Sequence, residues 1–389
     1  MPGSGNARRA AAAGIVVALT AGLAAVAPSS QAASDSDSSE RGYVVTLASD
    51  TRAASGEGRD LAEKYGLKVT HTYRSALNGF AVRATSAEAK RLAADPSVTA
   101  ISRDITVHAD GLQPNPPSWG LDRIDQQRLP LNRSFRYPEP AGQGVTVYVI
   151  DTGVRTTHRD FGGRARSGFD FVDNDPIAQD GNGHGTHVAG TIAGRNYGVA
   201  KRSNVVAVRV LNNQGSGTLG QVIAGVDFVT RNARKPAVAN MSLGAGANAL
   251  LDQAVRRSIA SGVTYSVAAG NENRPASLVS PARVAEAITV AASDRGDVRA
   301  PFSNYGLSVD VFAPGVGITS AGIVNDNASR TLSGTSMAAP HVAGAAALYL
   351  DQRRLAPPAE VARMLMLRSA KNLITNPGPG TANRLLQAN

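Results

Sequence analysis

Cysteine is absent from the 389 residues of the chain. Its absence excludes disulfide frameworks, thiolate zinc sites, iron–sulfur clusters and a cysteine nucleophile. The charged fraction is low at 18%, and the hydrophobic fraction of 42% is high enough for a large buried core. The 40 basic and 30 acidic residues are scattered, so no basic segment favours a nucleic-acid partner. We therefore expect globular domains with a solvated, positively charged surface.

A long apolar run occurs only near the N-terminus. Arg8 and Arg9 precede the apolar residues 10–27, and a small-residue segment at 29–33 follows. This order is typical of a secretory signal peptide, which we place at residues 1–33. The alternative is a membrane anchor, because the run is at the lower limit for spanning a bilayer. Ala and Gly dominate the run and no basic cluster follows it, which favours a secreted, extracellular protein with no membrane association after signal cleavage.

Residues 34–110 are predicted to form a small α+β domain, which begins with a polar linker. The pattern predicts strands at 43–47, 68–73, 77–83 and 98–102, and helices at 59–65 and 86–94. The order β-α-β-β-α-β is the split βαβ, or ferredoxin-like, arrangement. The turn-rich residues 111–118 mark the boundary with the rest of the chain.

Residues 111–389 are predicted to form a larger α/β domain. Short apolar runs, bounded by Gly, Asn, Asp or Pro, predict buried strands at 145–150, 205–211, 237–241, 263–269, 287–291 and 309–312. Helical segments such as 217–234 and 248–261 separate them. Runs that are apolar on both faces favour a mainly parallel sheet covered by helices on both sides. Open sheets of this kind bind ligands at the carboxyl ends of their strands.

Asp151 and Ser336 lie at positions that suit catalysis. Asp151 ends the apolar run 145–150, so its carboxylate is expected at the ligand-binding edge of the sheet. Ser336 follows Gly334 and opens a helix of small residues, where helix amides and the helix dipole favour an oxyanion. Each residue also has a structural explanation, Asp151 as a turn former and Ser336 as a helix N-cap.

His184 is flanked by Gly183 and Gly185 at the start of a helical segment. The glycines keep other side chains away from its ring, which suits proton transfer. His187 lies three residues further along, and the two histidines could suggest a metal pair. The zincin pattern needs a spacing of four with an intervening Glu, so zinc is not favoured. We interpret His187 as a buried, hydrogen-bonded helix residue.

Asp, His and Ser in this chain order on an α/β sheet match the subtilisin type of triad. The segments VIDTGV, NGHGTHVAGTIAG, ANMSLG, AAGNEN, SNYG, FAPG and SGTSMAAPHVAG are similar to subtilase motifs in that family's spacing. WGLDRIDQ, YGVAK and SPARV narrow the resemblance to the proteinase K and aqualysin-like branch. The resemblance covers residues 119–386, and residues 41–108 resemble the family's propeptide inhibitor domain.

The resemblance implies a three-layer subtilisin-like fold and a serine endopeptidase made as an autoprocessed zymogen. Ser336 would be the nucleophile, His184 the general base and acid, and Asp151 the residue that orients His184. Asn271 resembles the family's oxyanion asparagine, and its side-chain amide would act together with the Ser336 N–H. The alternative for Asn271 is a turn asparagine.

The resemblance also implies where substrates bind. Substrates would pair as an added strand with two segments, Gly215-Ser216-Gly217 and Ser242-Leu243-Gly244. The second segment, with Ala268, Ala269 and Gly270, would form the walls of a small apolar P1 pocket that favours aromatic or aliphatic residues. Glu272 near the pocket base would widen acceptance to Lys or Arg and disfavour acidic P1 residues.

Structural Ca²⁺ is implied by the family, with oxygen ligands only. Asp310 with the carbonyls of Ala285 and Ala287 resembles one site, and the other two are Asp170 with Asp175, and Asp122 with Asp125 and Gln126. The alternative for each is a solvated acidic cluster. No catalytic metal or organic cofactor is expected.

Residues 34–110 would act as the intramolecular inhibitor and folding assistant, and would be removed within one or two residues of Asp110. The mature enzyme is expected to be a monomer that acts on protein and peptide substrates. A non-enzymatic relative would lack a triad or oxyanion residue, whereas all four are present. A processing protease of narrow basic specificity would carry acidic clusters in its pockets, and only Glu272 qualifies.

Overall fold

The computed structural model describes residues 39–104 and 110–388. The predicted signal peptide lies outside these residues. The chain divides into two compact units between Val107 and His108, and each unit is described by itself. Among the described helices, none combines the length and apolar character needed to cross a bilayer.

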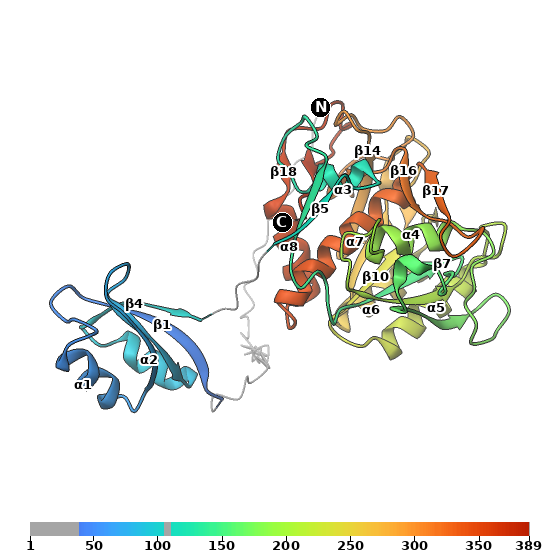
Figure 1. The fold of residues 1–389 in the computed structure, drawn as a ribbon. Coiled ribbons are helices and arrows are strands. Elements are labelled where there is room, and N and C mark those ends of the chain that lie inside the picture. The colour runs from blue at the N-terminus through green and yellow to red at the C-terminus, as the bar shows by residue number, and fades with distance from the viewer. Residues whose placement is uncertain (1–38, 105–109, 389) are drawn as a thin grey trace, which may run out of the picture. The chain divides into compact units, whose positions relative to one another are not determined.

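The first unit is a four-stranded antiparallel sheet with two helices (Figure 1). Its elements are β1 (Arg41–Leu47), α1 (Gly56–Lys64), β2 (Lys68–Tyr73), β3 (Gly79–Ala84), α2 (Ser86–Ala93) and β4 (Val98–Arg103). The strands are ordered β2-β3-β1-β4. Val45 and Phe80 of the sheet pack with Leu61 of α1 and Leu92 of α2 to form the core. The predicted β-α-β-β-α-β order is therefore confirmed.

The second unit is built around a nine-stranded sheet with the order β18-β19-β15-β14-β12-β10-β7-β9-β8. Its strands are β7 (Thr146–Asp151), β8 (Ala165–Asp170), β9 (Asn204–Arg209), β10 (Ala237–Met241), β12 (Thr264–Ala268), β14 (Ile288–Ser293), β15 (Val311–Pro314), β18 (Ala370–Lys371) and β19 (Arg384–Leu385). Every strand pair is parallel except the edge pair β18–β19.

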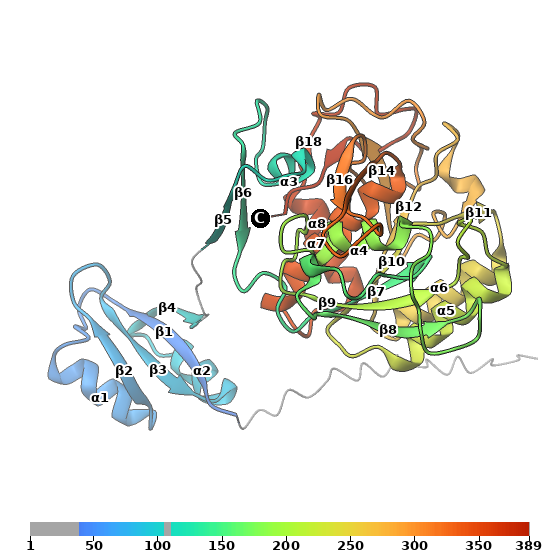
Figure 2. The ribbon, with the colours of Figure 1, turned by 45° about the vertical axis from the view of Figure 1, so that its right-hand side comes forward.

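Helices cover both faces of this sheet (Figures 1 and 2). They are α3 (Trp119–Ile124), α4 (His184–Ala193), α5 (Leu219–Asn232), α6 (Ala249–Ala260), α7 (Thr335–Gln352) and α8 (Pro358–Arg368). In β7, Val147 and Val149 pack against α4 and α7, whereas Tyr148 and Ile150 pack against α5 and α6. This alternation follows from the period of two in a strand, and it produces the three layers that the resemblance implied.

Short elements complete the second unit. They are the strand pairs β5 (Asp110–Pro114) with β6 (Ser134–Pro138), β11 (Ala245–Gly246) with β13 (Val279–Ser280) and β16 (Ile318–Ala321) with β17 (Ser329–Leu332), and the turns η1 (Arg159–Phe161) and η2 (Ala276–Leu278). Asp110 is the first residue of β5 and pairs with Pro138.

Helix α7 lies within the core, and almost all of its residues are buried. Small residues allow neighbouring segments to approach it closely. A methyl group built on Gly344 would lie 2.6 Å from the Cβ atom of Val199. Dense packing holds the helix in place, and with it Ser336 near its N-terminus.

Candidate active site

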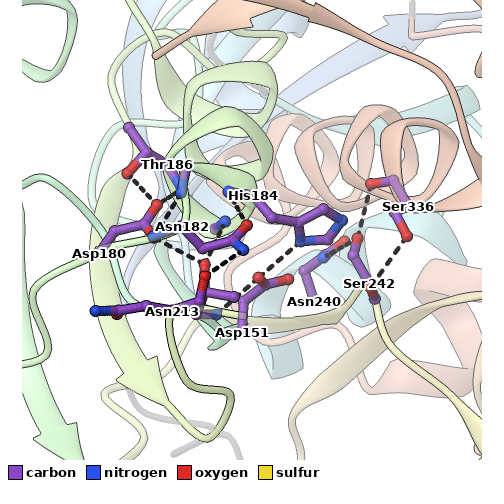
Figure 3. A network of polar contacts seen from close by, with 12 residues as sticks. Asp151, Asp180, Asn182, His184, Thr186, Asn213, Asn240, Ser242 and Ser336 are labelled. Atoms are coloured by element: carbon purple, nitrogen blue, oxygen red, sulfur yellow. Dashed lines mark hydrogen bonds and ion pairs between the residues drawn. The ribbon is translucent and has the colours of Figure 1, made fainter. Parts of the chain in front are cut away.

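Three segments that are distant in sequence meet at the carboxyl edge of the sheet (Figure 3). Asp151 is the last residue of β7, and His184 is the first residue of α4. Ser336, in the first turn of α7, is hydrogen-bonded to Ser242, which follows β10. Since β7 and β10 are parallel neighbours, their carboxyl ends share one edge of the sheet.

The Asp151 carboxylate binds the His184 ring. Asp151 Oδ1 lies 2.7 Å from His184 Nδ1, and it also accepts the Thr152 N–H at 2.7 Å. Asp151 is fully buried, and the His184 side chain is 26% exposed. Burial lowers the pKa of His184, but the charge and hydrogen bond of Asp151, with a smaller contribution from Asp180, raise the pKa above its ordinary value.

Asp180, which the sequence did not single out, fixes the start of helix α4. Its Oδ1 accepts the N–H groups of Asn182 and Gly183, and the hydroxyl of Thr152 at 2.9 Å. Its Oδ2 accepts the N–H and the hydroxyl of Thr186. A carboxylate at this position satisfies helix N-terminal donors and so holds the turn that carries the imidazole.

The Ser336 hydroxyl donates to the Ser242 carbonyl oxygen at 3.1 Å, and the Ser242 hydroxyl donates to the Ser336 carbonyl at 2.8 Å. The Asn240 amide in turn donates to the Ser242 hydroxyl at 2.9 Å. Among the contacts of the described residues, none joins the His184 ring to the Ser336 hydroxyl, although the ring lies between Asp151 and Ser336 (Figure 3).

Two other histidines have structural partners. His187 Nε2 lies 2.9 Å from the Ile318 carbonyl, and His341 Nδ1 lies 2.9 Å from the Met337 carbonyl. Both rings are buried, and burial lowers the pKa of each to about 4. These rings are therefore neutral at physiological pH.

The Asn271 side chain is oriented by Thr335. Asn271 Oδ1 accepts the Thr335 N–H at 2.8 Å and the Thr335 hydroxyl at 3.0 Å. Because an N–H can only donate, the atom that it contacts must be the oxygen, and the Nδ2 donor is left to point elsewhere. Asn271 and Ser336 line the same cavity, so a donor there is within reach of the reaction site.

Two neighbouring cavities lie along this edge. One has a volume of about 570 Å³, and His184, Gly215, Ser216, Gly217 and Ser242 are among its lining residues. The other has a volume of about 320 Å³, and Ala268, Gly270, Asn271, Glu272 and Ser336 are among its lining residues. Leu243 and Gly244 line both. Ala269 lines neither, because its side chain is packed in a separate core cluster beneath the site.

The loop that carries Asn271 is held by Asn304. Asn304 Oδ1 accepts the N–H groups of Glu272 and Arg274 at 3.0 and 3.1 Å. Its Nδ2 donates to the Ala269 carbonyl at 2.9 Å and to Glu272 Oε2 at 3.0 Å. Asn304 is fully buried, and every donor and acceptor of its carboxamide is used in this loop.

Asp310 is a half-buried carboxylate just before strand β15. Its Oδ2 accepts the N–H of Thr289 at 2.8 Å, two residues after the predicted carbonyl ligand Ala287. Burial raises the pKa of Asp310 to about 6, because the charged form is poorly solvated. A nearby cation would relieve this cost.

Asp170 is already neutralised by a side chain. Arg209 Nη1 bridges the carboxylates of Asp170 and Asp173. The other oxygen of Asp170 accepts two backbone N–H groups, and Asp175 Oδ1 accepts the Ile177 N–H at 2.7 Å. The guanidinium therefore supplies the positive charge that a metal ion would bring here.

Asp122, Asp125 and Gln126 converge on one loop. Asp122 accepts the N–H of Asn132 at 3.1 Å, Gln126 Oε1 accepts the same N–H at 3.3 Å, and Asp125 accepts the Arg136 N–H at 2.6 Å. Burial and the charge of Asp122 raise the pKa of Asp125 to about 6. Within residues 39–104 and 110–388, no three His, Cys, Asp or Glu residues are grouped closely enough to hold a metal ion.

Residues 142–386 match the subtilase family, and residues 16–110 match the peptidase inhibitor I9 family. The chain belongs to the subtilase family. It is a serine-type endopeptidase, and the inhibitor segment that precedes the catalytic domain is the arrangement of a zymogen. Both the family and the fold that the motifs implied are confirmed.

Several relatives of this subtilase are named proteinases. It is 51% identical to the "Extracellular serine proteinase" of Thermus sp. (strain Rt41A) over 82% of this chain and 78% of that protein. It is 49% identical to "Alkaline serine exoprotease A" of Vibrio alginolyticus over 83% of this chain and 60% of that protein. The crystal structure of a cold adapted subtilisin-like serine proteinase is 53% identical, with a TM-score of 0.68, over 70% of this chain and 98% of that one.

Four residues of the site were missed from the sequence: Asp180, Arg274, Asn304 and Thr335. Three of them lie within or next to recognisable segments, since Asp180 precedes NGHGTH, Asn304 is in SNYG and Thr335 adjoins Ser336. Asn304 and Thr335 bond to the loop at 269–274, far away in the sequence, and such contacts leave no local pattern. Asp180 bonds mostly to residues 182–186, so its place just before NGHGTH was an available signal. Arg274 carries no sequence signal, because its relation to Glu272 depends on how the loop turns.

Proposed function

We propose that the subtilase cleaves peptide bonds through a covalent acyl-enzyme, with Ser336, His184 and Asp151 as its triad. The observation that carries this proposal is the 2.7 Å contact between the buried Asp151 carboxylate and His184, at the sheet edge that also holds Ser336. A buried carboxylate on Nδ1 fixes the tautomer whose Nε2 is free to accept a proton.

The reaction takes two steps. Ser336 Oγ attacks the peptide carbonyl and passes its proton to His184 Nε2; the C–N bond then breaks, and the imidazolium gives the proton to the leaving amine. Water next attacks the ester carbonyl and gives a proton to His184, which returns it to Ser336 Oγ as the ester bond breaks. Asp151 stabilises the imidazolium in both steps.

The Ser336 hydroxyl must turn from the Ser242 carbonyl toward His184 before the attack. Such a turn needs only a change of side-chain rotamer. A substrate strand that pairs with the Ser242–Gly244 segment would bind through the same backbone groups. Substrate binding would then release the hydroxyl.

Asn271 Nδ2 and the Ser336 N–H would stabilise the oxyanion. The hydrogen bonds from Thr335 to Asn271 Oδ1 support this role, because they hold the carboxamide by its oxygen and leave the nitrogen as the donor beside the cavity that both residues line. Donors fixed in advance are worth most in a site from which water is excluded.

The two cavities suit an extended peptide. The larger one, lined by Gly215, Ser216 and Gly217, would take residues before P1, and the smaller one would take the P1 side chain. Leu243, Ala268 and Val279 give this cavity an apolar part, which would favour aromatic or aliphatic P1 residues, although polar atoms make up the larger part of its lining. Glu272 lies in the same cavity and would attract Lys or Arg.

Structural Ca²⁺ is proposed at Asp310, with carbonyls of Ala285 and Ala287, and at the loop bound by Asp122, Asp125 and Gln126. The raised pKa values of Asp310 and Asp125 support a cation at both places. The Asp170–Asp175 position fits poorly, because Arg209 already neutralises Asp170. When bound, the ion would fix loops and take no part in the reaction.

We also propose that the protein is secreted through residues 1–33 and matures to a monomer by cleavage near Asp110. The Thermus relative named extracellular supports secretion, and the inhibitor segment supports self-inhibition before cleavage. N-terminal sequencing and size-exclusion chromatography of the mature enzyme would test these points.

A serine-directed fluorophosphonate probe and a peptide substrate test the proposed function. Wild type should be labelled and active, whereas Ser336→Ala should be neither. His184→Ala should fold normally, as judged by circular dichroism, and lose activity by several orders of magnitude. Equal labelling of Ser336→Ala and wild type would refute the assignment.

A further inference from the structure

The cavity proposed for the P1 side chain holds charges of both signs. Glu272 and Arg274 line it together with Ser336 and Asn271. Arg274 Nε lies 3.7 Å from Glu272 Oε2, and about half of each side chain is exposed. The expectation that Glu272 acts alone in this pocket is therefore incomplete.

Glu272 is the fixed member of the pair. Its Oε2 accepts a hydrogen bond from Asn304 Nδ2 at 3.0 Å, and its N–H donates to Asn304 Oδ1 at 3.0 Å. The same oxygen lies against Gly270, because a methyl group built there would be 2.9 Å from it. The carboxylate is thus tied to a buried residue on one side.

Arg274 is the loosely held member. The 3.7 Å separation is longer than a hydrogen bond, and among the described residues its guanidinium makes no hydrogen bond. A guanidinium has five N–H donors in a planar fork that matches a carboxylate. Since exposed ion pairs contribute little stability, turning from Glu272 to another carboxylate costs little.

We propose that Arg274 determines the charge preference of the P1 pocket. It gives the pocket affinity for Asp or Glu at P1, and it offsets the attraction of Glu272 for Lys or Arg. The substrate class of the enzyme then extends from apolar P1 residues to acidic ones. This inference rests on the proposed function, since it assigns the cavity to the P1 side chain.

The test compares kcat/KM for peptides that differ only at P1, with Phe, Gln, Glu or Lys there. Arg274→Gln should lower kcat/KM for the P1 Glu peptide relative to the P1 Gln peptide, and should raise kcat/KM for the P1 Lys peptide relative to the same reference. Each of these two ratios should change by about threefold to tenfold, as expected for a partly solvated charge pair. Glu272→Gln should move both ratios the opposite way. Both effects should shrink in 1 M salt, because salt screens charges.

Arg256→Gln is the matched control, because Arg256 and Glu286 form a pair of the same kind, at 3.4 Å and with the same exposure as Arg274 and Glu272. Arg256→Gln should leave both ratios unchanged. Ratios that move less than twofold in Arg274→Gln, or equally in the control, overturn the inference, as does a wild type that rejects P1 Glu outright. Cleavage of the P1 Phe peptide separates the two proposals. If the wild type does not cleave this peptide, the proposed function is wrong. If it cleaves the peptide normally but the kcat/KM ratios do not change in Arg274→Gln, only this inference is wrong.

Discussion

Asn304 packs directly against Gly270, since a methyl group built on Gly270 would lie 2.3 Å from Asn304 Nδ2. Gly270 also has a φ of +104°, a backbone conformation that residues other than glycine rarely adopt. Its N–H donates to the Thr335 hydroxyl at 3.2 Å. The residue before Asn271 is therefore fixed from two sides, by a loop and by the helix that carries Ser336.

Gly270→Ala should displace Asn271 and lower kcat by about 10²-fold, the loss typical of a missing oxyanion donor. It should also lower the melting temperature, because Asn304 must give way. Gly246→Ala is the control, since Gly246 lines the same cavity and has open space around it. Steady-state kinetics with a P1 Phe peptide measures the effect, and a normal kcat in Gly270→Ala would contradict it.

Thr335→Val should lower kcat by about tenfold with little change in KM, because the hydroxyl that holds Asn271 Oδ1 is lost while the backbone N–H remains. Thr335→Ser keeps the hydroxyl and should retain most of the activity. A change confined to KM would show that Thr335 acts on substrate binding instead.

The pH profile of kcat/KM should have its acid limb above pH 6.5, because Asp151 raises the pKa of His184 and only neutral His184 can accept a proton. Asp151→Asn removes the raising charge and leaves burial, which lowers the pKa. The limb should therefore move to lower pH, with kcat reduced by about 10⁴-fold. Asp227→Asn, an exposed partner of Arg231, should leave the profile unchanged. A limb that stays in place in Asp151→Asn would argue against the pairing.

Asp310 should link stability to pH and to Ca²⁺. Its pKa is raised in the folded state to about 6, so its contribution to stability is present below about pH 4 and is lost as pH rises through about 6. Melting temperatures in chelator should show this fall, and added Ca²⁺ should reverse it by stabilising the ionised carboxylate. These measurements should be made on proteins that also carry Ser336→Ala, so that the samples do not digest themselves. Asp310→Asn should show a smaller pH effect and a smaller response to Ca²⁺, and an unchanged response would exclude Asp310 as a ligand.

The parts of the fold that the sequence predicted are those set by local pattern. Strand β7, which ends at Asp151, is buried at every position, and the run before Asp151 is apolar apart from Thr146, as is typical where both faces of a strand are covered. Helix α5 begins after Thr218 with a capping box to Gln221, close to the predicted start at 217. Asp151, His184 and Ser336 are each marked by adjacent small residues, so they could be selected before their proximity was known.

The missed parts depend on long-range contacts. Arg209 ends strand β9 and forms ion pairs with Asp170 and Asp173. No sequence pattern connects residues this far apart in the chain. Asn304 bonds to a loop some thirty residues earlier in the chain. Ala269 follows Ala268 in a stretch where neighbouring side chains point to opposite sides, so only one of the two can face a pocket.

The burial of helix α7 has a consequence for how long the enzyme stays active. Because the proposed nucleophile, Ser336, sits on a helix that is buried along almost its whole length, a molecule whose interior loosens should lose its activity in the same event. Active molecules of the enzyme should also digest the unfolded chains, so cooling should not restore the lost activity. The half-life of a preparation is then governed by the height of the unfolding barrier and by enzyme concentration, rather than by an equilibrium constant.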